Sequence, residues 1–123
     1  ALGPVNGHIA YSSFAATEAY LERNKETVHR FIRGYARGLT WLHESDPAAI
    51  GDAVGGFFPG VPSELITKSV ARYKEQGTWP AIPHLEQPEF EGLQEMLMAA
   101  GMVKEHQPYV KIVRPEFVRD ALA

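Results

Sequence analysis

Residues 24–46 read NKETVHRFIRGYARGLTWLHESD, and the interpretation of the whole chain starts from this stretch. Apolar side chains recur at steps of three and four residues, which predicts one amphipathic helix of about six turns. Asn24 is a candidate N-cap, and Asp46-Pro47 ends this helix and begins the next. A helix with one apolar stripe is not stable alone, so it needs a partner surface. The stripe consists of Val28, Phe31, Ile32, Tyr35, Leu39 and Leu42.

The composition is typical of one soluble globular domain: 123 residues, 45% hydrophobic and 22% charged. The formal net charge of −3 disfavours a nucleic-acid partner. The absence of cysteine is compatible with an oxidising compartment, and no apolar run approaches the roughly 18 residues that span a bilayer. The sequence starts at Ala1 without a signal-peptide pattern, so we expect a mature product, a fragment or an engineered piece.

Shorter elements are predicted on both sides of the long helix. The segment HIAYSSF, from His8 to Phe14, alternates loosely and is a candidate strand. A short helix over residues 15–23 follows, with Thr17 able to cap it. Further helices are predicted to begin at Pro47, Ser63 and Gln87, with glycines at their C-terminal ends. Residues 109–113 (YVKIV) are a second candidate strand, and a last helical turn begins at Pro115.

Side chains that could carry catalysis or bind a metal ion are few. His29 and His43 lie on one predicted helix about 20 Å apart, which is too far for one metal ion. The glycines of residues 51–56 superficially resemble a phosphate loop, but they lie within a helical pattern and follow no strand. The Ser12-Ser13 pair has no base beside it except His8. The residues alone therefore indicate a mainly helical piece without a catalytic constellation, a metal site or a cofactor.

The order of the segments is similar to that of a known family. The segment ending in YLERN is followed by ETVHRFIRGYARGLTWLHESDP, AAIGDAVGGFFPGVPSELI, ARYKEQGTW and PEFEGLQEMLMAAGMV. This order resembles the C-terminal part of ABC-importer periplasmic substrate-binding proteins of the nitrate, sulfonate, taurine and thiamine-pyrimidine-precursor type. The resemblance covers nearly all 123 residues. The chain departs from the family pattern at Lys25 and Pro62, where proline and aspartate are common, and at Gly34 and Gly38, where alanine is common.

The resemblance implies a mainly α fold with one or two short strands, forming the helical C-terminal portion of a periplasmic-binding-protein type II α/β lobe. Residues 1–14 would be a hinge or crossover strand segment, and residues 15–123 the helical part of the first lobe. Most of the sheet and most ligand-binding residues would lie upstream.

Four residues of this chain would lie nearest the hinge and the ligand cleft: His8, Tyr11, Ser12 and Ser13. Tyr11 could stack on a ligand ring, and the serine hydroxyls could donate hydrogen bonds to an anionic or carbonyl group. A purely structural role of the serines, at a turn or strand end, is an equally good interpretation.

The function implied is that of a non-enzymatic solute-binding component of an ABC importer. It would capture a small organic molecule, such as a sulfonate, a nitrate-like anion, or a pyrimidine or aromatic compound. We expect a periplasmic or extracytoplasmic location, a transporter permease as partner, and no cofactor. Two alternatives stay open: a thiamine-pyrimidine synthase-like enzyme of the same fold, and a helical protein-interaction module. Because its apolar faces would pack on a missing lobe, we expect the isolated chain to form a homodimer.

Overall fold

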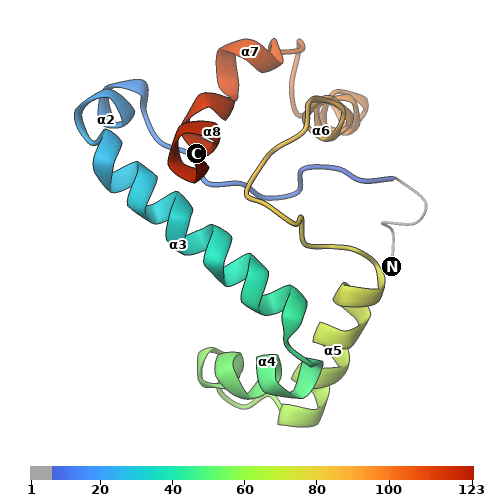
Figure 1. The fold of residues 1–123 in the computed structure, drawn as a ribbon. Coiled ribbons are helices and arrows are strands. Elements are labelled where there is room, and N and C mark those ends of the chain that lie inside the picture. The colour runs from blue at the N-terminus through green and yellow to red at the C-terminus, as the bar shows by residue number, and fades with distance from the viewer. Residues whose placement is uncertain (1–6) are drawn as a thin grey trace. The chain divides into compact units, whose positions relative to one another are not determined.

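The computed structural model describes residues 7–123, and this part of the chain is built from helices and loops without a β-strand (Figure 1). The mainly α prediction is therefore confirmed. The helices are α2 (Glu18–Arg23), α3 (Lys25–Glu44), α4 (Pro47–Val54), the 3-10 turn η1 (Gly55–Phe57), α5 (Ser63–Glu75), α6 (Gln87–Ala99), α7 (Tyr109–Ile112) and α8 (Pro115–Leu122).

Both predicted strands are wrong for the described residues. Residues 8–14 are extended, but the inter-segment backbone bond recorded for them is Ala10 N–H to the Glu89 carbonyl at 3.1 Å, which does not make a ladder. Residues 109–112 form the helical turn α7, closed by Lys111 N–H to the Pro108 carbonyl at 3.0 Å. A short apolar run becomes a strand only when another strand pairs with it, and without that partner the local turn forms instead.

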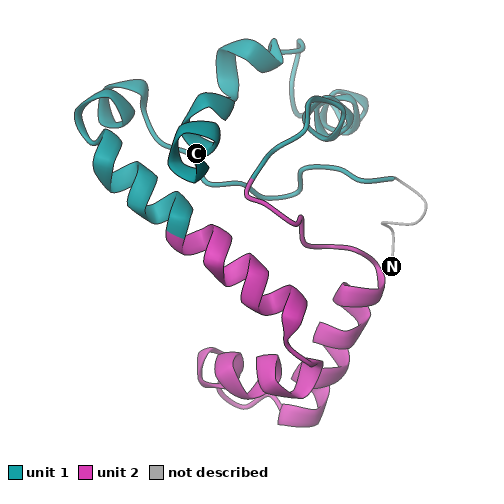
Figure 2. Ribbon diagram, viewed as in Figure 1, with its two compact units in different colours: residues 1–33, 84–123 teal, residues 34–83 magenta. Residues whose placement is uncertain are grey.

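The chain divides into two compact units, each described here by itself (Figure 2). Unit 1 comprises residues 1–33 and 84–123, and unit 2 comprises residues 34–83. The long helix α3 begins in unit 1 and ends in unit 2. The predicted division into residues 1–14 and 15–123 concerns a larger protein and stays a prediction; residues 1–6 lie outside the described part.

Each unit has a small apolar core. In unit 1, a side chain of α3 packs with two of α8: the buried residues are Ile32, Phe117 and Ala121, flanked by Leu21, Val28 and Val118. In unit 2, α4 packs on α5: the buried residues are Ile50, Ile66 and Val70, flanked by Leu42, Val54 and Trp79.

The helix ends follow the chemistry expected from the sequence at most positions. Asp46 accepts hydrogen bonds from the N–H groups of Ala48 and Ala49, both at 2.9 Å, and so caps α4 as predicted. Asn24 departs from its predicted role as the cap of α3, because its Nδ2 donates to the Tyr20 carbonyl at 2.9 Å and ends α2.

Glycine ends α6 in the predicted Schellman motif. Gly101 has φ +70°, a backbone conformation that other residues rarely adopt. Its N–H donates to the Met98 carbonyl at 2.9 Å, and Met102 N–H donates to the Leu97 carbonyl at 2.8 Å.

The described residues cover the apolar stripe of α3 only in part. Ile32 and Leu39 are buried, with 8% and 2% of their surfaces exposed. Phe31 and Tyr35 belong to the same stripe but remain 49% and 36% exposed. The stripe is therefore wider than the surface that this chain packs against it.

Candidate functional site

The four sequence-predicted site residues lie in the extended segment that precedes α2 in unit 1. His8, Tyr11, Ser12 and Ser13 are all exposed, Tyr11 by 88%. Ile9, between them, lies against α6: a Cβ added at Gly92 would be 3.3 Å from Ile9 Cγ2. The segment is thus held on α6 while the four side chains face solvent, and their role in ligand binding stays a prediction.

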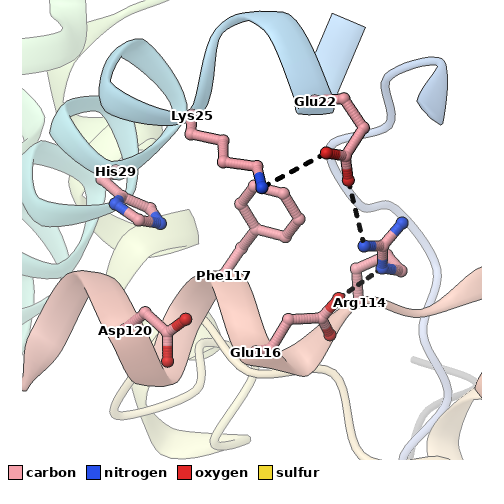
Figure 3. A pocket seen from close by; sticks show the side chains of 7 residues that line it. All are labelled: Glu22, Lys25, His29, Arg114, Glu116, Phe117 and Asp120. Atoms are coloured by element: carbon pink, nitrogen blue, oxygen red, sulfur yellow. Dashed lines mark hydrogen bonds and ion pairs between the residues drawn. The ribbon is translucent and has the colours of Figure 1, made fainter. Parts of the chain in front are cut away.

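A pocket that none of these four residues lines is found elsewhere in unit 1 (Figure 3). It is open, has a volume of about 100 Å³, and lies between α8 and the residues where α2 ends and α3 begins. Pockets that hold small molecules usually measure about 300–1,000 Å³. Its lining is mostly charged: Glu22, Lys25, His29, Arg114, Glu116, Phe117 and Asp120.

Arg114 connects the elements around this pocket. Its Nε donates to Glu116 Oε1, its Nη1 lies 3.4 Å from Glu18 Oε1, and its Nη2 lies 3.7 Å from Glu22 Oε1. The guanidinium carbon also lies 5.4 Å from the centroid of the Phe117 ring, within the range of a cation–π interaction. These contacts tie the start of α8 to α2.

The hydrogen bond between Arg114 and Glu116 favours the charged form of both groups. It raises the pKa of Arg114 and lowers the pKa of the Glu116 carboxyl below its ordinary value of 4.5. Neither group can exchange a proton readily near neutral pH, which a general acid or base has to do.

The remaining charges of the pocket also have partners within the chain. Lys25 Nζ lies 3.2 Å from Glu22 Oε2, and Asp120 Oδ1 accepts from Arg119 Nε at 2.9 Å. The His29 ring meets the Phe117 ring edge to face, with centroids 5.8 Å apart. A small pocket whose charges neutralise one another serves to join helices, and we assign it a structural role.

The search for other site chemistry covers residues 7–123. In this range, no group of three or more His, Asp or Glu side chains is arranged to hold a metal ion. None of the helices described combines the length and the apolar character that crossing a bilayer requires.

Sequence reasoning did not find the Arg114 cluster. Arg114 and Glu18 are 96 positions apart, and no periodic pattern connects them. The local sequence Arg114-Pro115-Glu116 contained a weak signal, because opposite charges flank the proline that begins α8.

Comparison with known proteins places this chain near one curated binding protein. It is similar to "Putative binding protein YtlA" of Bacillus subtilis (strain 168), with 29% identity over 114 residues. The matched part is 93% of this chain and 34% of YtlA, so the chain spans about a third of the length of that relative. No family model matches the sequence, and no solved structure matches it.

Proposed function

We propose that this chain is the C-terminal helical part of a solute-binding protein that serves an ABC importer. The observation that carries the proposal is the similarity to a binding protein along 93% of the chain, although the chain covers only 34% of that protein. The order of the segments, which resembles importer binding proteins, supplies the finer assignment. The ligand would be a sulfonate, a nitrate-like anion, or a pyrimidine or aromatic compound.

The structural features are compatible with a part of a larger binding protein. The apolar stripe of α3 is only partly covered, and the segment of residues 8–14 is extended and carries the exposed Tyr11. In the whole protein, this segment would connect the two lobes, and His8, Tyr11, Ser12 and Ser13 would lie at the edge of the ligand cleft. The protein would work in the periplasm or another extracytoplasmic space and deliver its ligand to a permease.

The test is a thermal-shift titration of the longer protein with taurine and other sulfonates, nitrate, pyrimidines and aromatic acids. A ligand at 100 times its Kd should stabilise the folded protein by about 2.7 kcal/mol, which a melting curve resolves. A protein that melts at the same temperature with every member of the panel would contradict the proposal.

The predicted site is tested within the same experiment. Tyr11→Ala and the double variant Ser12→Ala, Ser13→Ala should weaken the ligand-induced shift. Tyr20→Ala is the matched control, because Tyr20 is an exposed tyrosine on α2, outside the predicted site. Variants that bind like the unmodified protein would remove the four residues from the site and leave the function intact. Formation of a thiamine pyrimidine by the longer protein would instead indicate the enzyme alternative.

A further inference from the structure

Helix α3 carries an exposed face in unit 2 that we call the aromatic–glycine face: Gly34, Tyr35, Gly38 and Trp41. Residues 34, 38 and 41 are spaced by four and three positions, so they line one side of the helix, with Tyr35 beside them. All four are exposed, Trp41 by 44% and Tyr35 by 36%. None carries a charge. Two large aromatic rings thus flank a part of the helix that has no side chains.

The glycines of this face have no explanation within the described residues. A Cβ added at Gly34 or Gly38 would meet nothing within 4 Å. Neither residue has a positive φ, so an alanine would fit the backbone. Glycine weakens a helix because it loses more conformational freedom on folding than alanine does. Two glycines one turn apart are therefore a cost to α3 that this chain alone does not require.

Close approach of another backbone is the usual reason for such a glycine, because a side chain would keep the two backbones apart. Large exposed aromatic side chains beside it would supply apolar area to the same contact. Leu39, only 2% exposed, already anchors a different side of α3 within unit 2. The aromatic–glycine face is thus a second apolar side of a helix whose first side is buried.

We propose that this face is the docking surface for an uncharged, apolar helix or strand of the longer protein, whose backbone crosses α3 at Gly34 and Gly38. The inference rests on the proposed function, because the chain covers only 34% of YtlA and the rest of such a protein supplies the partner element. The partner is apolar because it meets two aromatic rings and no charge.

The test uses one substitution in two proteins. In the 123-residue chain, Gly34→Ala and Gly38→Ala should each raise the Tm by roughly 4 °C, because the added methyl group enters open space and alanine favours the helix. In the longer protein, the same substitutions should lower the Tm, because the methyl group meets the backbone of the docked element. The sign of the shift therefore reports whether the face is covered.

Thr40→Ala is the matched control. Thr40 lies on the polar side of α3 with Arg33 and Arg37, at the spacing of four and three residues. Its replacement should change the Tm in the same direction in both proteins. A reversal of sign at Thr40 as well would overturn the proposal, because the effect would not belong to the aromatic–glycine face.

A second measurement does not depend on any variant. Hydroxyl radicals should oxidise Trp41 several-fold more slowly in the longer protein than in the 123-residue chain. Trp79, which packs beside the core of unit 2, should react equally in both and is the internal reference. Equal oxidation of Trp41, together with a positive Tm shift for Gly38→Ala in both proteins, would overturn the proposal. A longer protein that shows the reversal of sign but binds no solute would remove the proposed function and leave this inference standing.

Discussion

Glu116 and Arg114 form the hydrogen bond on which the first prediction rests. Because the pKa of Glu116 is lowered in the folded state, its contribution to stability is present above the ordinary value of 4.5 and is lost as the pH falls through the lower folded-state value. Glu116→Gln should reduce the free energy of unfolding at pH 7 by less than about 1 kcal/mol, the size usual for solvent-accessible pairs. The reduction should shrink as the pH falls below 4.5.

Urea denaturation at pH 7 and pH 3 measures both values. Glu95→Gln, at an exposed position of α6, is the control and should show no such pH dependence. A reduction of equal size at the two pH values would mean that Glu116 contributes by packing and not by its charge.

A second prediction at the scale of single residues concerns Gly51, where α4 packs closely on α5. A Cβ added there would lie 2.7 Å from Thr67 Oγ1 and 3.5 Å from Thr67 Cα. Gly51→Ala should therefore destabilise the protein by about 1–3 kcal/mol, as overpacking does elsewhere. Gly55→Ala is the control, because a Cβ at Gly55 would meet nothing within 4 Å.

A double-mutant cycle locates the cause of this effect. Thr67→Ala removes the hydroxyl that the new methyl group would meet, so it should recover part of the stability lost in Gly51→Ala. Denaturant midpoints of the four proteins give the interaction energy. Additive effects would show that the contact between Gly51 and Thr67 is not responsible.

At the scale of elements, a lysine of α5 completes the end of α3. Lys74 Nζ donates to the carbonyls of Leu42, His43 and Ser45, the first two at 3.0 and 3.1 Å. The last carbonyls of a helix have no partner within it, and a cation near them is favourable. Lys74→Met should therefore cost about 1–2 kcal/mol, since buried or partly buried polar groups lose charge-assisted hydrogen bonds.

Amide hydrogen exchange should show faster exchange in the last turn of α3 in Lys74→Met. Lys68→Met, which removes an exposed pair with Glu64 on the same helix, should leave α3 unchanged. Unaltered exchange around Leu42 in Lys74→Met would show that water replaces the lysine without loss.

The helix ends could be predicted where the chemistry is local. Asp46 followed by Pro47, and Gly101 after α6, are signals read within a few residues, and both act as expected. Asn24 could not be assigned from the sequence, because it stands between two helices and can cap either. The segments of residues 8–14 and 109–113 failed as strands because pairing depends on a distant partner.

At the scale of the whole molecule, the exposed apolar surface predicts association of the 123-residue chain. Phe31 is 49% exposed and belongs to the stripe of α3, and apolar surface left in water drives self-association. We expect a homodimer at tens of micromolar, and Phe31→Asp should abolish it by placing a charge in the contact. Sedimentation velocity is the measurement.

Thr40→Asp is the control for this prediction, because it adds the same charge on the polar side of α3. It should leave the sedimentation coefficient unchanged. A folded monomer of the unmodified chain at these concentrations would contradict the prediction.

The sequence by itself determined the helical class, the long helix from Lys25 to Glu44 and most of the helix ends. These follow from periodicity and capping, which act between residues at most a few positions apart. Only the tertiary structure decided that Ile32 and Leu39 are buried while Phe31 is not, because the apolar spacing is the same for all three. It also decided the contacts of Arg114 with Glu18 and of Lys74 with the end of α3, which join residues far apart in the chain and so leave no local pattern.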